Sequence, residues 1–479
     1  MNIEEMKLYA SDWASSSKRD FFEAAKRIWA HPELSMQEHE SSAELQRLLR
    51  RHGFKVEACV GGMPTAFIAQ YGSGSPVIGI NCEYDALPGL SQDASRTEKH
   101  PLQEGGPGHG CGHNLLGAGG AFAAAILKSA LEKYALPGTI KAIGAPAEEL
   151  CLGKPFLAKA GLLSGYDAIL DWHPSWLNMS NYVECPAYFS VKYHYTGKAA
   201  HGNSPWEGRS ALDAAMLQGQ ATEFLREHIY PGNPPYAAST FNYTFSDAGP
   251  EFPSVVADRA TIWYVGRFAE ADQASEAMRR ISNCAAGAAL MTDTEVRAEI
   301  LAATNNKIPN ETLSECMHKN FQKIGPPVFT QDEQQKAREV QRALGVAQTG
   351  LPSGLEPLGG GFTPVTDITE YSWNAPFATA CVALAPNNTG WHNWCVAYFA
   401  GNSIGLKSME TAAKLIALTG VDLLADPALV EKAKAEHISR LSGKSYVCRL
   451  PEGASPPVDL NRDIMKRYSS GAVSNRGQM

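Results

Sequence analysis

The stretch Ile140-Lys-Ala-Ile-Gly-Ala-Pro-Ala-Glu-Glu149 joins a short apolar run to two adjacent carboxylates. Three more apolar runs occur at residues 77–80, 168–172 and 377–385. All are rich in Val, Ile and Ala and do not alternate cleanly with polar residues, which is typical of strands buried on both faces. Helical patterns separate several of them, notably at 115–134. We therefore predict an α/β domain, an open mixed sheet with helices on both faces.

Between about Pro186 and Asn305 the sequence pattern changes. Residues 188–196 alternate apolar and polar side chains, which is typical of a strand with one solvent-exposed face. Further helix and strand patterns follow at 209–229, 255–265, 274–290 and 294–301. The order strand, helix, two strands, helix, strand is typical of an α+β unit with a four-stranded sheet. We predict this inserted domain at 187–306, the α/β domain in two parts at 1–186 and 307–448, and an extended tail at 449–479.

The chain ahead of the first apolar run is predicted to be helical. Apolar residues recur at helical spacing from Phe21 to His52, and Gly53 follows as a C-terminal cap.

Composition excludes several classes of protein. A chain of 479 residues is long enough for two domains. A net charge of -8 argues against binding to nucleic acid, which needs clustered Lys and Arg. Residues 1–20 do not resemble an export signal, and no apolar run is long enough to span a bilayer. With ten scattered cysteines, we expect a cytoplasmic protein with reduced thiols that has no nucleic-acid or membrane partner.

Residue types that bind metals stand at the downstream ends of these apolar runs. Cys111 and His113 lie in a Gly-rich stretch, Glu149 ends Pro-Ala-Glu-Glu, His173 follows Asp-Trp, and His392 lies in Gly-Trp-His-Asn-Trp. Ligands of open α/β sheets bind beyond the carboxyl ends of the strands. Four separate segments with the same chemistry therefore predict one metal centre along one edge of the sheet.

Each of these segments has a simpler interpretation when it is taken alone. Cys111 and His113 fit a buried Cys and a structural His in a Gly-rich loop, although glycines also let a backbone bend around an ion. A helix beginning near Asn114 would favour the thiolate form of the cysteine. His173 or His392 by itself is more often a core or surface residue. The joint pattern favours the metal centre.

Thiolate, imidazole and carboxylate ligands suit zinc or manganese without choosing between them. Five ligands exceed one tetrahedral site, so we expect two divalent ions about 3.5–4 Å apart, with Cys111 as the candidate bridge. Because adjacent side chains diverge, Glu149 is expected to bind an ion while Glu148 accepts a proton from the attacking water and passes it to the leaving amine. Asp85 either orients a ligand histidine or is a turn residue before Pro88.

Together these residues resemble the metallopeptidase family that includes aminoacylases and carboxypeptidase G (peptidase family M20), and within it the branch of the p-aminobenzoyl-glutamate hydrolase B-subunit. The resemblance runs from about residue 15 to about residue 445. It rests on His31-Pro-Glu33, Glu83-Tyr-Asp-Ala-Leu87, Gly108-His-Gly-Cys-Gly-His-Asn-Leu-Leu-Gly117, Glu148-Glu149, Trp172-His-Pro174, Ala200-His201, Gly208-Arg-Ser-Ala-Leu-Asp-Ala214 and Ala286-Gly-Ala-Ala-Leu-Met-Thr292.

The resemblance implies a di-metal catalytic domain and makes the insertion a lid or dimerisation domain, so a homodimer through it is expected. By position, the metal ligands are Cys111, His113, Glu149, His173 and His392, and Glu148 is the general base and acid. His201 matches a lid histidine that polarises the substrate carbonyl, often in the site of a partner subunit. Arg267 matches an arginine that holds the substrate carboxylate, a task that suits its planar fork.

Departures from the family pattern concern the substrate side. Ser254 replaces the usual Asn, Asn242 stands where the nearest branch has His, Glu370 replaces Asp, and Leu406 begins a run that replaces His-Lys-Gly-Met. We take Ser254, Asn242 and Arg267 as candidate substrate-binding residues. Because the catalytic set is kept and the binding set is changed, the sequence predicts the reaction type more firmly than the substrate.

We therefore expect a metal-dependent amidohydrolase or peptidase that hydrolyses the amide bond of a small N-acyl or N-aroyl amino acid similar to p-aminobenzoyl-glutamate. Two alternatives remain open from the sequence. One is an aminohydrolase that releases ammonia from an aromatic amine on the same scaffold. The other is a binding or partner subunit that keeps the fold but has no catalytic activity.

Overall fold

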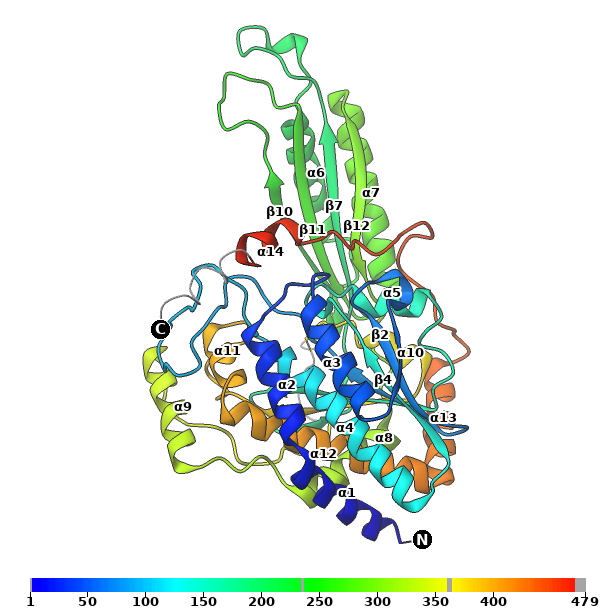
Figure 1. Cartoon of the computed structure of the whole chain (residues 1–479). Coiled ribbons are helices and arrows are strands. Elements are labelled where there is room, and N and C mark those ends of the chain that lie inside the picture. Colours follow the sequence, from blue (N-terminus) through cyan, green and yellow to red (C-terminus); the bar gives the residue numbers. More distant parts are fainter. Residues whose placement is uncertain (1, 234–236, 360–363, 470–479) are drawn as a thin grey trace.

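A seven-stranded mixed sheet lies at the centre of the larger domain in the computed structural model, which describes residues 2–233, 237–359 and 364–469 (Figure 1). The strand order is β1-β2-β4-β3-β5-β13-β6. Adjacent strands β4, β3, β5 and β13 pair in parallel, and the outer pairs are antiparallel. The strands are β1 (Lys55–Ala58), β2 (Phe67–Ser73), β3 (Val77–Cys82), β4 (Gly138–Gly144), β5 (Ala168–Ser175), β6 (Met179–Asn181) and β13 (Phe377–Ala383).

Helices cover both faces of this sheet, as predicted. Ile80 and Leu170 point into a core with α4 (His113–Tyr134) and α12 (Ser403–Ala425), whereas Ile143 and Ile169 point into a second core with α5 (Gly153–Lys159) and α10 (Thr369–Asn374). The other helices are α1 (Ile3–Ser17), α2 (Arg19–Ala30), α3 (His39–Arg51), α8 (Glu311–Ile324), α9 (Gln331–Ala343), α11 (Trp394–Ala400), α13 (Pro427–Leu441) and α14 (Arg462–Ser469).

Helix α4 packs unusually close to β3, and its glycines make this approach possible. A Cβ atom at Gly117 would lie 2.4 Å from the carbonyl oxygen of Glu83, and one at Gly120 would lie 2.2 Å from that of Asn81. Among the described helices, α4 is also the one long and apolar enough to cross a membrane, but 94% of its most apolar window is buried within the fold. It is a core helix, and its start is fixed against the end of β3.

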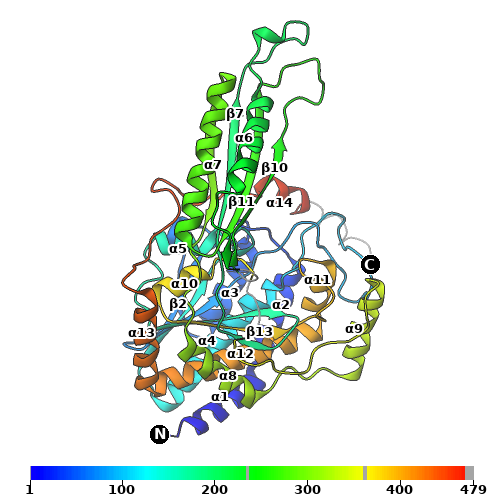
Figure 2. The same ribbon diagram turned by 180° about the vertical axis from the view of Figure 1, so that it is seen from behind.

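The inserted domain is a four-stranded antiparallel sheet that projects from the larger domain (Figure 2). Its strands lie in the order β10-β11-β7-β12, with α6 (Ala211–Arg226) and α7 (Ala271–Thr292) packed on one face. This confirms the predicted four-stranded insertion. The strands are β7 (Ala187–Thr196), β10 (Thr240–Asp247), β11 (Arg259–Phe268) and β12 (Glu295–Ala303), and a small ribbon is formed by β8 (Gly232–Asn233) and β9 (Ala237–Ala238).

The helix predicted over residues 21–52 is two helices, because α2 ends at Ala30 and α3 begins at His39. Pro32 lacks an N–H and disfavours helical geometry at the residue before it. The carboxylate of Glu33 then accepts hydrogen bonds from the backbone N–H groups of Glu40 (3.0 Å) and Ser41 (2.8 Å), which starts the second helix.

The tail predicted to be extended from residue 449 forms helix α14 at Arg462–Ser469 instead. Met465 and Tyr468 of this helix line a cavity of about 330 Å³ together with Trp29. Just before the helix, Gln37 donates hydrogen bonds to the carbonyl oxygens of Val458 and Leu460. These contacts hold the segment on the larger domain; residues 470–479 of the predicted tail lie outside the described residues.

Candidate metal centre and active site

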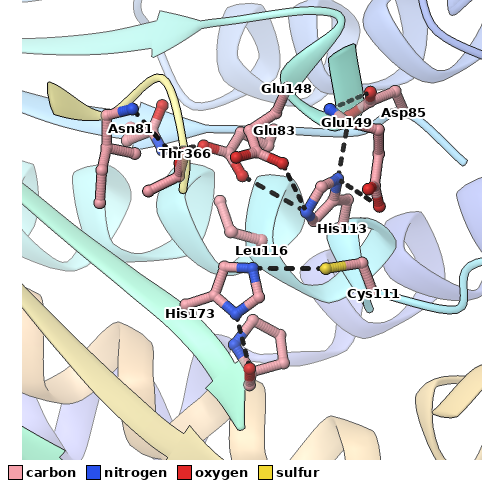
Figure 3. A network of polar contacts seen from close by, with 12 residues as sticks. Asn81, Glu83, Asp85, Cys111, His113, Leu116, Glu148, Glu149, His173 and Thr366 are labelled. Atoms are coloured by element: carbon pink, nitrogen blue, oxygen red, sulfur yellow. Dashed lines mark hydrogen bonds and ion pairs between the residues drawn. The ribbon is translucent and has the colours of Figure 1, made fainter. Parts of the chain in front are cut away.

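The parallel strands bring the predicted ligands of the larger domain together at one edge of the sheet, and Figure 3 shows Cys111, His113, Glu149 and His173 among them. The Cys111 sulfur lies 3.4 Å from Nε2 of His173, and Nε2 of His392 lies 3.3 Å from Oε2 of Glu149. Two groups of potential ligand atoms, each within 4.8 Å of one another, are Cys111, His113 and His173, and Cys111, Glu149 and His392. The two groups share the sulfur of Cys111.

The backbone before the two adjacent carboxylates is held in a rare conformation. Ala147 has φ 57°, in the left-handed region, and Glu148 and Glu149 follow it in a short 3-10 turn. His392 also has a positive φ, 53°. Such conformations cost about 1–3 kcal/mol each in residues other than glycine, and they concentrate at functional sites.

Asp85 fixes the direction of two of these groups. Nδ1 of His113 donates to Oδ1 of Asp85 at 2.9 Å. The other oxygen, Oδ2, accepts from the backbone N–H of Glu149 at 3.0 Å and from the Ser35 hydroxyl at 2.8 Å. The His113 ring is therefore oriented so that Nε2 is the nitrogen left to bind a cation.

Unpaired polar atoms in the centre show that the residues fit a divalent cation. Glu83 Oε2, His113 Nε2 and Glu149 Oε1 are buried without a hydrogen-bond partner among the described residues. Buried polar atoms without partners are costly, and a cation between them removes this cost. Nitrogen, sulfur and carboxylate oxygen are also the ligand atoms that zinc accepts, and manganese shares the oxygen and nitrogen ligands.

Burial sets the protonation of the centre. It raises the pKa of Glu148 to about 7, helped by the charge of Glu83, and it raises the pKa of Glu149 well above its usual value. Burial, with Glu149 next to it, also raises the pKa of the Cys111 thiol to about 12. The expectation that the start of α4 alone favours the thiolate is therefore wrong. A cation would restore the thiolate and both carboxylates.

Several residues of the site carry no motif in the sequence. Lys154 is fully buried, with Nζ 2.8 Å from Oε1 of Glu83 and 2.5 Å from Oδ1 of Asp367. Trp391, by contrast, lies in the motif around His392, and it donates its ring N–H to the Cys111 sulfur at 3.2 Å. Glu83 could have been recognised from the sequence as a candidate site residue, because it directly follows an apolar run, as Glu148 does. Nothing in the sequence around Lys154 or Asp367 distinguishes them from surface charges.

The comparisons with known proteins agree with this geometry. The model of peptidase family M20/M25/M40 matches residues 79–419. The chain is 34% identical to the B-subunit of p-aminobenzoyl-glutamate hydrolase from Escherichia coli (strain K12), over 95% of this chain and 99% of that protein. The chain belongs to the M20/M25/M40 family. It is also 29% identical to the Xaa-Arg dipeptidase of Mus musculus, over 94% of each protein.

Solved structures of M20 relatives share the fold. A dinuclear metal-binding M20 peptidase from Bacillus subtilis aligns with a TM-score of 0.54 at 18% identity, covering 85% of this chain and 98% of that chain. An aminobenzoyl-glutamate utilization protein from Klebsiella pneumoniae aligns with a TM-score of 0.58 at 16% identity, covering 89% and 99%. Family membership confirms the expected enzyme class: the chain is a metal-dependent hydrolase of amide bonds.

The predicted residues of the M20 insertion do not lie at the metal centre in the described part of the chain. His201 is exposed in the loop after β7 and pairs with Val255, next to Ser254, at the tip of the insertion. Arg267 and Asn242 lie near its base, where Arg267 pairs with Tyr188 at the start of β7. The eight residue-to-residue steps from Tyr188 to Thr196, the last residue of β7, span about 27 Å, so His201 and Arg267 of one chain cannot serve the same site.

Two of the departures from the M20 pattern lie in the core instead of a pocket. Glu370 is buried and accepts a hydrogen bond from the backbone N–H of Asn305 at 2.7 Å. Leu406 packs against the core around α4 and α12. These two changes alter internal packing and hydrogen bonding, whereas Ser254 and Asn242 are in the inserted domain.

Proposed function

We propose that this protein hydrolyses the amide bond of an N-acyl or N-aroyl amino acid similar to p-aminobenzoyl-glutamate. The observation that carries the proposal is the pair of ligand groups that share Cys111, with Glu148 beside them. We assign Cys111, His113, Glu149, His173 and His392 as ligands of two divalent ions, manganese or zinc. The relation to a p-aminobenzoyl-glutamate hydrolase supports the substrate class.

Glu148 is the proposed general base and acid. When bound, the ions would polarise the substrate carbonyl and lower the pKa of water. The Glu148 carboxylate, with Oε2 3.7 Å from His113 Nε2, takes a proton from the attacking water and returns it to the departing nitrogen. Without a cation, burial and the charge of Glu83 raise the pKa of Glu148 to about 7; bound ions would favour its carboxylate form, which is the form that accepts the proton.

Arg267 is the proposed anchor for the substrate carboxylate. Its guanidinium lies 5.7 Å from the centre of the Tyr188 ring, at the base of the insertion. Arg267 is half-buried and, among the described residues, takes part in no ion pair, so its charge is available to a substrate. Asn242 on the neighbouring strand is proposed to adjust substrate choice beside Arg267, and Ser254 at the tip is proposed to do so in the site that His201 enters.

The insertion is the proposed dimer interface, and His201 is proposed to reach the active site of the second chain. The distance between tip and base supports this, because His201 cannot act beside Arg267 of the same chain. Exposed apolar side chains on the insertion also support an interface; they include Trp206, Met216, Phe224, Phe252, Leu290 and Met291. We also propose a cytoplasmic location, which the ten free cysteines support.

The test is turnover of a panel of N-acyl and N-aroyl amino acids, with p-aminobenzoyl-glutamate included, by chelator-treated protein refilled with manganese or zinc. Amino acid and ammonia are assayed separately. Metal-dependent release of an amino acid is expected, and release of ammonia alone would replace the proposal with deamination. Glu148→Gln is expected to abolish turnover while it keeps the bound metal, and loss of metal in this variant would contradict the assigned role.

A further inference from the structure

The one metal-binding nitrogen of His113 faces a carboxylate outside the assigned ligand set. Nδ1 of the ring is engaged by Asp85, so an ion held by His113 must lie at Nε2. Nε2 lies 3.5 Å from Oε2 of Glu83 and 3.7 Å from Oε2 of Glu148 (Figure 3). Glu83, His113 and Glu148 also form a group whose potential ligand atoms lie within 4.8 Å of one another. All three residues are buried.

The surroundings of Glu83 fix one of its oxygens and leave the other unpaired. Oε1 accepts a hydrogen bond from the side-chain amide of Asn81 at 2.8 Å and pairs with Lys154 Nζ at 2.8 Å. Oε2 is buried and has no partner among the described residues. The Lys154 ammonium lies between Oε1 of Glu83 and Asp367, so it does not occupy Oε2. The unpaired oxygen therefore faces Nε2 of His113.

We propose that Glu83 binds, through Oε2, the ion that His113 holds, and is thus a further ligand of the metal centre. Two ligand atoms about 2.1 Å from one ion lie about 3.4 Å apart at a tetrahedral angle, close to the 3.5 Å between Oε2 and Nε2. Lys154 supports this arrangement because it occupies Oε1 and turns Oε2 toward the ion. The inference rests on the proposed metal centre and adds a residue to it.

The competing explanation is that Glu83 only neutralises Lys154 inside the fold. In that case a change at Glu83 would act through buried charge and leave metal binding nearly as it is. Asp171 provides a matched control, because it is buried beside the same Asn81. Both of its oxygens are already paired, Oδ1 with Asn81 at 2.9 Å and Oδ2 with the Thr379 hydroxyl at 2.8 Å. It has no oxygen left for an ion.

The experiment measures metal binding without turnover. Chelator-treated wild type, Glu83→Gln and Asp171→Asn are dialysed against a series of Mn²⁺ concentrations, and bound manganese per chain is measured by mass spectrometry. Glu83→Gln is expected to weaken the binding of one of the two ions by at least about tenfold and to leave the other unchanged. Asp171→Asn is expected to bind both ions within about threefold of wild type.

Unchanged binding in Glu83→Gln overturns the inference, and so does equal weakening in both variants, because equal weakening would be an effect of buried charge. If Glu83→Gln does not fold, as judged by circular dichroism and Tm, Glu83→Asp keeps the charge but withdraws the oxygen by one methylene. The same loss at one ion is then expected, and wild-type binding of both ions overturns the inference. A wild-type chain that binds no manganese or zinc would instead remove the proposed metal centre itself.

Discussion

The Glu38 carboxyl group accepts a hydrogen bond from the backbone N–H of Ala147 at 2.9 Å, directly before the adjacent Glu148 and Glu149. Ala147 is the residue with the left-handed backbone, φ 57°. Glu38 is fully buried; its Oε1 also accepts from the Met36 N–H at 2.8 Å, and its Oε2 is hydrogen-bonded to the Thr65 hydroxyl at 3.0 Å. Glu38 thus holds the peptide that decides where Glu148 points.

Replacing Glu38 with Ala is expected to lower kcat by at least about tenfold, because misplacing a catalytic group by about 1 Å has effects of this size and more. KM is expected to change little, since Glu38 is not among the proposed substrate contacts. Kinetics at saturating metal provide the measurement. Glu38→Gln is the control: its amide oxygen can accept from Ala147 and Met36 while its NH₂ donates to Thr65, so activity should return. A loss of the same size in both variants would contradict the positioning role.

The same residue predicts a pH dependence of stability. Burial, followed by the charge of Asp85, raises the pKa of Glu38 from 4.5 to about 8. In this window the folded chain keeps a proton that the unfolded chain has lost, so stability falls as pH rises from about 4.5 through 8. Glu38→Gln cannot lose that proton. In metal-free protein, the Tm of Glu38→Gln should therefore rise relative to the Tm of wild type as the pH increases from 5 to 8. A constant difference in Tm would contradict the raised pKa.

The positions of the proposed ligands were predictable from sequence for a physical reason. Parallel strands carry their carboxyl ends to one edge, so residues that follow β3, β4, β5 and β13 must meet there. The sequence of the loop after β4 also identified two carboxylates with divergent side chains. Sequence pattern and strand direction together were enough to predict that Cys111, Glu149 and His173 would lie close together.

The supporting residues were not predictable, because their roles depend on side-chain directions that no local pattern encodes. Glu38 follows a Pro-interrupted helical pattern, yet it reaches Ala147, more than a hundred residues later in the chain. Lys154 resembles a surface lysine in sequence but is fully buried between Glu83 and Asp367. The break between α2 and α3 was missed because the apolar spacing continued across Pro32.

Arg267→Ala is expected to raise KM about 10- to 100-fold for substrates with a free carboxylate, since a charged hydrogen bond contributes about 1.5–3 kcal/mol. The same variant should hardly affect a substrate whose carboxylate is an amide. Arg259→Ala is the matched control, because Arg259 lies at the other end of β11, where it pairs with Asp247. Steady-state kinetics on the acid and amide forms give the comparison. An equal rise in KM for the acid and amide forms would show that Arg267 does not bind the substrate carboxylate.

If His201 completes the active site of a second chain, two inactive variants should restore each other. His201→Ala lacks the lid histidine and Glu148→Gln lacks the base, so each is expected to be nearly inactive alone. In a mixed dimer, the site with intact Glu148 receives His201 from the other chain and regains both groups. Random pairing of equal amounts makes half of the dimers mixed with one working site each, so about a quarter of wild-type activity is expected.

Co-expression of the two variants with different tags, followed by purification through both tags, isolates the mixed dimer and should raise this value to about half. Because His201 is exposed, its replacement is expected to leave the fold intact, so a loss of activity can be assigned to the missing imidazole. Recovery requires that the tip of one insertion reaches the metal centre of the other chain. This tip lies about 27 Å from the base of its own insertion. No recovery in the purified mixed dimer would mean that His201 acts within its own chain or not at all, and the insertion would then have to bend toward its own metal centre.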